Sequence, residues 1–169
     1  MIRTGAIRSA VAAAMLLALS ACSGEPSGNA SAGTAAAERI SVTVTTADGT
    51  EHVFNTERAI TRAQQDRGYM YRTDIGPDDA MLFYPYPAEG GGPREASFWM
   101  KNTPMPLDII FIRSDGSIAR IAENTIPYSS NQIRSGEPVS AVLEVVGGRT
   151  AELGISPGDT VSWPGQGGG

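Results

Sequence analysis

An apolar hairpin pattern in the middle of the chain constrains the fold more than any other feature. The run LDIIFI is apolar apart from Asp108, and the pair Asp115-Gly116 separates it from a second run, SIARIAE. An Asp-Gly pair between two such runs is a strong signal for a β-hairpin. We therefore expect strands over residues 107–113 and 117–123. Both faces of this hairpin are largely apolar, which predicts a central position in the sheet rather than an edge position.

The expected register places one acid opposite another. With a two-residue turn, Ile112 faces Ala119 and Asp108 faces Glu123. Directly opposed residues lie about 4.5–5.5 Å apart at Cβ, where like charges are destabilising, and a buried unpaired carboxylate costs several kcal/mol. The pair therefore requires a cation between the acids, a proton on one of them, nearby hydrogen-bond donors, or a β-bulge that separates them.

Hydrogen-bond donors are the solution that the sequence favours for Asp108. Its end of the strand follows the turn KNTP, and Asn102 and Thr103 of this turn can direct their amides toward the carboxylate. On this interpretation, Asp108 anchors the turn to the sheet. Ligand or metal binding and catalysis are the alternatives. Glu144, which interrupts the apolar run VLEVV, has the same set of alternatives.

The rest of the domain is typical of short strands with frequent turns. Thr61 and Gln64 form a capping-box pattern that predicts a helix over Arg62–Arg67, ended by Gly68. Other expected elements are strands over 39–46, near 53–54, and over 80–85, 139–146 and 160–163, loops over 85–96 and 124–138, and a helical turn within 147–154. The pattern predicts a mainly β fold, a small β-sandwich or partly closed barrel with one or two short helices.

The N-terminus has the pattern of a bacterial lipoprotein leader. Arg3 and Arg8 precede an apolar stretch over residues 10–19, which is too short to span a bilayer and fits a signal peptide over residues 1–21. Its end, LSAC, resembles a lipobox, which implies lipidation of Cys22. The residue that follows is Ser rather than Asp, which by analogy with lipoprotein sorting favours the periplasmic face of the outer membrane.

Domain boundaries follow from composition. Residues 22–38 are small and polar, so we expect a flexible tether between the lipid and the domain. The folded domain is expected over residues 39–163. The Gly-rich tail over residues 164–169 is expected to be disordered.

Charge and residue usage limit the partners. One Cys and one His exclude an internal disulfide and a zinc site made from Cys and His alone. Loss of the two leader arginines leaves 11 basic residues against 18 acidic ones. This balance argues against nucleic-acid binding and against electrostatic attachment to an anionic membrane, so membrane association would depend on the lipid. We expect no cofactor and no metal site.

Five signatures in order resemble the uncharacterised "domain of unknown function 192" family. They are GYM at 68–70, AMLF at 80–83, SFWMKNTPMPLDIIFI at 97–112, SDGSI at 114–118 and VLEVVGGRTAELGISPGDTV at 142–161. The resemblance implies a compact β-rich fold, with sandwich or jelly-roll-like sheets, and no established activity. Two features depart from it. Tyr69 replaces the usual Leu and puts a polar tip at a core position, and the insertion PAEGGGPRE alters the rim of any cleft before Trp99.

These observations favour a lipid-anchored envelope module that binds a small ligand or an envelope protein without catalysis. The competing hypothesis is a small hydrolase that uses paired carboxylates, Asp108 with Glu123 or Glu144, and a purely structural accessory domain is the third. No GxSxG, HExxH or P-loop motif occurs. The candidate ligand-binding residues are Trp99, Met100, Asn102, Thr103, Asp108, Glu123 and Glu144.

Overall fold

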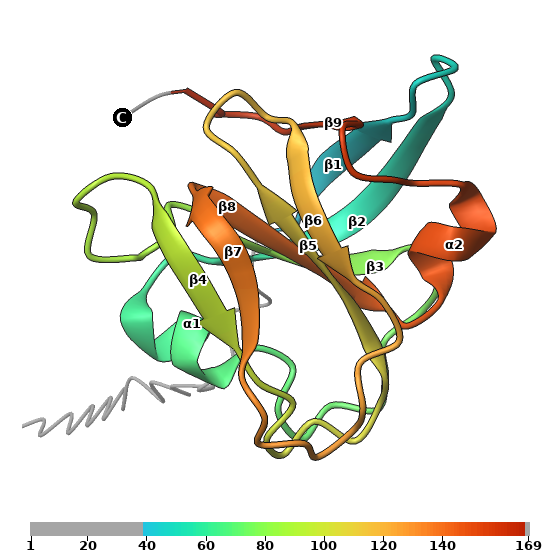
Figure 1. Cartoon of the computed structure of the whole chain (residues 1–169). Helices are drawn as coiled ribbons and strands as arrows, with labels where there is room; N and C mark the ends of the chain where they lie inside the picture. Colours follow the sequence, from blue (N-terminus) through green and yellow to red (C-terminus); the bar gives the residue numbers. More distant parts are fainter. Residues whose placement is uncertain (1–38, 168–169) are drawn as a thin grey trace, which may run out of the picture. The chain divides into compact units, whose positions relative to one another are not determined.

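The computed structural model describes residues 39–167. It shows a seven-stranded sheet with the order β6-β5-β8-β3-β2-β1-β9 and a separate two-stranded ribbon of β4 and β7 (Figure 1). The strands are β1 (Ile40–Thr45), β2 (Glu51–Ala59), β3 (Asp79–Phe83), β4 (Arg94–Phe98), β5 (Leu107–Ile112), β6 (Ile118–Ala122), β7 (Ile133–Val139), β8 (Ala141–Val146) and β9 (Thr160–Ser162). The predicted signal peptide, Cys22 and the tether lie outside the described residues.

The large sheet curls until its two ends meet. Ser117, just before β6, forms an isolated bridge with Thr160 of β9. The Ile118 amide donates to the Asp159 carbonyl at 2.8 Å. The sheet is therefore a nearly closed barrel, which confirms the predicted mainly β, partly closed architecture.

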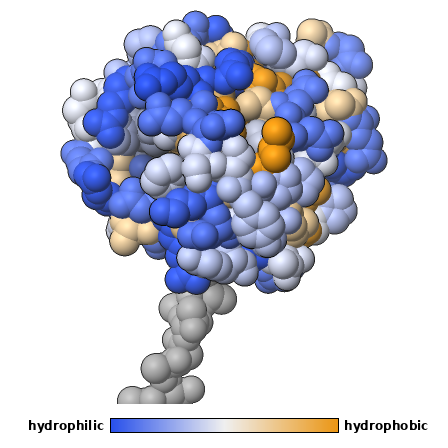
Figure 2. Space-filling view, turned by 60° about the horizontal axis from the view of Figure 1, so that its bottom comes forward, coloured by the Kyte–Doolittle hydropathy of each residue, from blue (hydrophilic) through white to orange (hydrophobic). Residues whose placement is uncertain are grey.

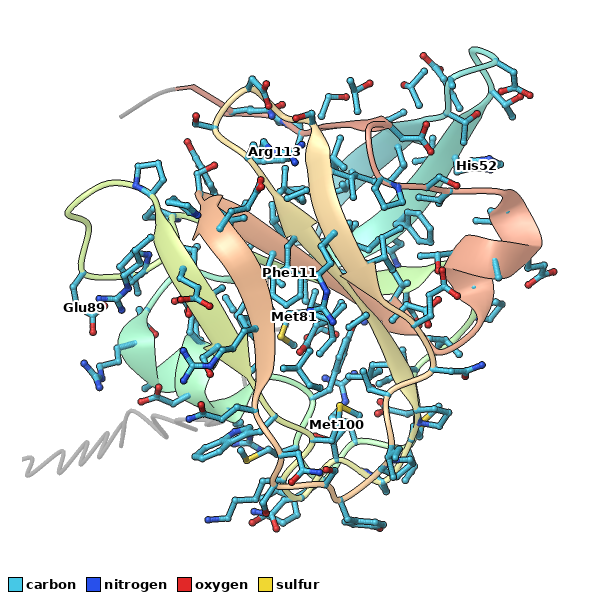
Figure 3. The ribbon with its side chains drawn as sticks, viewed as in Figure 1. His52, Met81, Glu89, Met100, Phe111 and Arg113 are labelled. Carbon is cyan, nitrogen blue, oxygen red and sulfur yellow. The ribbon has the colours of Figure 1, made fainter. Side chains whose placement is uncertain are left out.

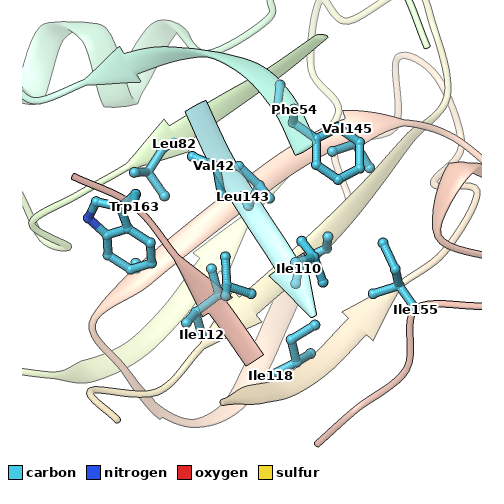
Figure 4. Packing of buried hydrophobic residues seen from close by; sticks show 14 residues of the cluster. Val42, Phe54, Leu82, Ile110, Ile112, Ile118, Leu143, Val145, Ile155 and Trp163 are labelled. Atoms are coloured by element: carbon cyan, nitrogen blue, oxygen red, sulfur yellow. The ribbon is translucent and has the colours of Figure 1, made fainter. Parts of the chain in front are cut away.

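Two apolar clusters lie on the two faces of this sheet. The first fills the barrel and includes Phe54, Leu82 and Ile110, all almost fully buried (Figure 4). The second lies outside the barrel and includes Phe83, Met100 and Phe111, together with residues of the β4–β7 ribbon, which covers it. Because β5 and β8 bury both faces, their sequences are continuous apolar runs instead of alternating ones.

The β5–β6 hairpin keeps the predicted register at one end only. Ile110 pairs with Ile121 as expected, but Ile112 pairs with Ile118 and not with Ala119. The turn holds an extra residue, because Gly116 adopts a φ of 86° and its amide donates to Arg113. The register shifts by one residue between Ile112 and Phe111, so the pairs farther from the turn are the expected ones. The expectation of a central position is right for β5 and wrong for β6, which ends the strand order.

Strands β4 and β7 replace what the sequence indicated as loops over 85–96 and 124–138. The two strands pair only with each other. β7 has the sequence IRSGEPV, in which Gly136 has a φ of 81° and Pro138 has no amide proton to donate. Neither residue is typical of a strand, so tertiary packing against the second cluster decides the structure here.

The two helices are short. α1 (Arg62–Arg67) has the predicted bounds: the Thr61 hydroxyl accepts from the Gln64 amide, the Gln64 side chain accepts from the Thr61 amide, and Gly68 ends the helix. α2 (Arg149–Leu153) confirms the predicted turn within 147–154. The end of α1 lies beside the second cluster, where it helps to form a cleft.

Candidate functional site

Asp108 is a structural acid whose carboxylate is fully hydrogen-bonded. It is completely buried. Oδ1 accepts from the Asn124 amide at 2.7 Å and the Gly148 amide at 2.9 Å. Oδ2 accepts from the amide and the hydroxyl of Thr150, at 2.9 and 2.7 Å. Asp108 therefore ties the loop after β6 and the start of α2 to strand β5.

The predicted donors, Asn102 and Thr103, are the wrong ones. The Asn102 carbonyl accepts from the Tyr71 amide at 2.8 Å, and the Thr103 carbonyl accepts from the Tyr128 amide at 3.0 Å. The KNTP turn thus joins two neighbouring loops instead of binding Asp108. The donors for Asp108 come from segments 16 to 42 residues away in sequence. Of these, only Asn124 lies in the loop that the expected hairpin brings to the same end as Asp108.

The predicted opposition of Asp108 and Glu123 does not form inside the sheet. β6 ends at Ala122, and Glu123 is exposed. Glu123 lines a separate shallow hollow between β6 and the loop that leads to β7. The strand end therefore relieves the charge conflict that the register implied.

Glu144 has the opposite environment to Asp108. It lies in the middle of β8, paired with Met81 of β3 and Ile109 of β5, and only 4% of it is exposed. Its Oε2 is buried without a hydrogen-bond partner. Burial raises the pKa of this carboxyl to about 8, because removal from water disfavours the charged form. Glu144 is therefore mainly a neutral acid at pH 7.

Tyr69 places a second unpartnered group near Glu144. The residue is 2% exposed and its hydroxyl has no partner. Burial, followed by the field of Glu144, raises the pKa of this phenol, so it keeps its proton. Gly68, just before Tyr69, lets the chain approach: a Cβ there would lie 3.5 Å from Glu144 Oε2.

Glu144 and Tyr69 lie in a cleft of about 180 Å³ between α1, the β3–β4 loop and β4. Phe83 and Phe98 form part of its aromatic wall, with ring centroids 5.1 Å apart. Trp99 is about half exposed at the opening. The lining of the cleft also includes Arg62, Asp66, Arg67, Tyr86, Glu89, Arg94 and Thr103. Glu89 lies on the loop before β4 (Figure 3).

The cleft brings together three of the residues predicted from sequence, Trp99, Thr103 and Glu144. Asn102 precedes Thr103 in the chain but does not line the cleft. Met100 is fully buried in the second cluster, Asp108 is used in the fold, and Glu123 lies elsewhere. The sequence did not indicate Arg67 or Arg94 as site residues.

Several large side chains with apolar surface are exposed at the loop end of the domain. Tyr71, Ile126 and Tyr128 are the most exposed of them. Figure 2, which brings this end forward, shows scattered apolar residues on a mostly hydrophilic surface. Scattered exposure of this kind is normal for a soluble surface.

Among residues 39–167, no group of three or more His, Cys, Asp or Glu side chains is arranged to hold a metal ion. No helix in that range has the length and apolar character needed to cross a membrane.

The fold and the site define a class of protein: a small, nearly closed β-barrel with a buried neutral acid in a side cleft. Residues 43–163 match the DUF192 family, described as an uncharacterized ACR, and the chain belongs to this family.

Two solved structures are similar to the chain. A protein of unknown function from Novosphingobium aromaticivorans DSM 12444 is 43% identical, with a TM-score of 0.70 over 78% of this chain and 89% of that one. A protein provisionally assigned as a transcription regulator from Sinorhizobium meliloti 1021 is 42% identical, with a TM-score of 0.69 over 75% of this chain and 94% of that one. No curated protein matches.

Proposed function

We propose that this protein is a non-catalytic module that binds a small ligand in the Glu144–Tyr69 cleft. The observation that carries the proposal is that two residues lining the cleft, Glu144 and Tyr69, each hold a buried polar atom without a hydrogen-bond partner. A buried polar group without a hydrogen bond costs about 1–3 kcal/mol. Native proteins satisfy most such groups, so the exceptions call for an explanation. A ligand that supplies both partners explains them.

Binding accounts for the acids better than paired-carboxylate hydrolysis does. Ile109 pairs directly with Glu144, so these two side chains share one face of the sheet. Asp108 precedes Ile109 in β5 and therefore points to the other face. The two acids therefore cannot act on one substrate. Asp66 and Glu89, the other acids of the cleft, form ion pairs with Arg62. The cleft thus offers one buried neutral acid instead of the two carboxyl groups that glycoside hydrolysis requires.

We also propose that a lipid on Cys22 holds the module at the periplasmic face of the outer membrane. The support is the sequence: the LSAC motif, the apolar stretch before it and the polar tether after it. An acyl chain contributes about 0.8 kcal/mol of membrane affinity per buried methylene. An acidic domain cannot gain this affinity by electrostatic attraction to an anionic membrane.

A thermal-shift screen of the full-length chain against envelope metabolites tests the binding proposal. A ligand that binds only the folded state stabilises it by RT ln(1 + [L]/Kd) and so raises the melting temperature. We expect at least one compound to stabilise the wild type and to lose its effect in Glu144→Ala. Glu123→Ala, outside the cleft, should keep the effect. Equal shifts in both variants, or none in the wild type, would refute the proposal.

Cell fractionation tests the anchor separately. Cys22→Ser should move the protein from the membrane fraction to the soluble fraction, because the acylation site is lost. Continued membrane association of this variant would contradict lipid anchoring and would leave the cleft proposal unaffected.

A further inference from the structure

We propose that the ligand of the cleft is a small organic anion, a carboxylate or a phosphate ester with a flat apolar body. An oxygen of the ligand accepts from Glu144 and Tyr69, and its charge faces Arg67 and Arg94. The inference rests on the proposed function and specifies the chemistry of its ligand.

The charge at the rim of the cleft favours an anion. Arg62 is neutralised by Glu89, at 2.6 Å, and by Asp66, at 3.6 Å. Among residues 39–167, neither Arg67 nor Arg94 has a carboxylate within 4.0 Å. Because the acids of the rim are used by Arg62, two guanidinium groups remain available. Guanidinium binds carboxylate and phosphate oxygens in a bidentate geometry.

The depth of the cleft adds donors without adding negative charge. Glu144 is protonated at pH 7 and Tyr69 keeps its proton, so each has an O–H to donate. No charged neighbour figures among the causes of the raised pKa of Glu144. The charged groups whose fields reach Tyr69 are Glu57, Arg72, Asp79 and Glu144 itself. Arg72 pairs with Glu57 and Arg39 pairs with Asp79, so this second layer is internally compensated.

The walls of the cleft fit a flat apolar body. Phe98 packs edge-on against Phe83 and at a tilt against Tyr86, with centroids 5.7 Å apart. Trp99 adds a half-exposed indole at the opening, with Lys101 Nζ 5.6 Å from its ring centroid. Aromatic surfaces of this kind bind planar groups by offset or edge contacts.

Two of these features, the Tyr69 phenol and Arg94, come from positions at which this chain departs from its family resemblance, whereas Glu144 belongs to a signature that the chain shares. Tyr69 supplies the phenol where Leu is usual. The insertion PAEGGGPRE contains both Glu89 and Arg94. The preference for an anion is therefore expected to be a property of this chain and of relatives that share these residues.

Four matched probes test the inference: benzoate, phenyl phosphate, benzylamine and benzyl alcohol. Each is titrated into the full-length chain while the amide of Gly68 and the indole of Trp99 are followed by NMR. We expect benzoate or phenyl phosphate to bind more tightly than the other two, and the comparison of these two identifies the preferred anion. Arg67→Gln combined with Arg94→Gln should weaken anion binding at least fivefold, whereas Arg149→Gln, on α2 and outside the lining of the cleft, should not change it.

The pH dependence separates the two signs of ligand charge. Between pH 6.5 and 9, ionisation of Glu144 should weaken anion binding about tenfold, and Glu144→Gln, which cannot ionise, should remove this dependence. Benzylamine binding that strengthens with pH and is lost in Glu144→Gln would overturn the anion inference and leave the binding function standing. Tightest binding by benzyl alcohol would likewise overturn the anion inference and leave the binding function standing. If no probe shifts the cleft resonances, the anion inference fails, and the thermal-shift screen alone then decides the binding function.

Discussion

Asp108 and Glu144 are the two acids of adjacent buried strands, and they project to opposite faces of one sheet. Asp108 pairs in register with Val145, and Glu144 pairs with Ile109. One carboxyl receives four hydrogen bonds, whereas the Oε2 of the other receives none. The same residue class in the same sheet therefore has two roles: Asp108 holds the fold together, and Glu144 is available to a ligand.

Asp108→Asn should reduce the free energy of unfolding by about 2–4 kcal/mol. The substituted amide turns an NH₂ group toward backbone donors, so at least one of the four hydrogen bonds is replaced by a repulsive contact. Urea denaturation measures the loss. Asp115→Asn, in the exposed turn, removes a local contact with Ser117 and should cost much less. Equal losses in the two variants would contradict the structural role of Asp108.

Gly116→Ala should destabilise the barrel by more than Gly136→Ala. Both glycines have a positive φ, 86° and 81°, so both variants carry a similar backbone strain of about 1 kcal/mol. Only at Gly116 would the new Cβ meet backbone, 3.0 Å from the Val161 carbonyl, where the sheet closes. The difference between the two unfolding free energies isolates the closure contact. Identical losses would show that closure adds nothing.

Tyr69→Phe should stabilise the ligand-free protein by about 1–2 kcal/mol, because it removes a buried hydroxyl without a partner. The same change should weaken binding of any ligand that accepts from this phenol. Tyr86→Phe is the matched control, since Tyr86 lines the cleft but is only partly buried. A loss of stability in Tyr69→Phe would show that the hydroxyl already has a partner.

Glu144→Gln should flatten the dependence of stability on pH. The pKa of Glu144 is about 8 in the folded protein against 4.5 for an ordinary Glu. The folded state therefore holds a proton that the unfolded state releases, and wild-type stability falls as pH rises from about 4.5 to 8. The variant lacks this loss, so its advantage over the wild type should be greater at pH 8.5 than at pH 5. Unfolding curves at both pH values measure this. A parallel pH dependence in the two proteins would contradict the assignment.

The sequence predicts elements well where the signal is local. The capping pair Thr61 and Gln64 gave α1 with its observed bounds. The Asp115-Gly116 turn and the run LDIIFI located the β5–β6 hairpin. The register shift after Phe111 could not be predicted, because Gly116 is compatible with turns of two or three residues. The length of the turn decides whether Ile118 or Ala119 faces the barrel.

The candidate site was only partly predictable, because its parts meet through tertiary structure. Glu144 could be noticed as an acid in an apolar run, and Tyr69 as a departure from the family pattern. Nothing in either segment indicates that the end of α1 lies against β8. Strand β4, which carries Arg94 to the rim, alternates over only four residues after a Gly-rich segment, and it pairs with β7 alone. The arginines of the rim could not be separated from solvated charges without that geometry.

The titration of the Glu144 side chain is the most direct test of whether the cleft holds a neutral acid. ¹³C NMR of the side-chain carboxyl in the full-length chain, assigned with Glu144→Gln, gives its midpoint in the folded protein. The account predicts a midpoint near pH 8. A midpoint near 4.5 would mean that the carboxyl is ionised and already solvated or paired at neutral pH, and the cleft would then lack the neutral donor on which its proposed ligand depends.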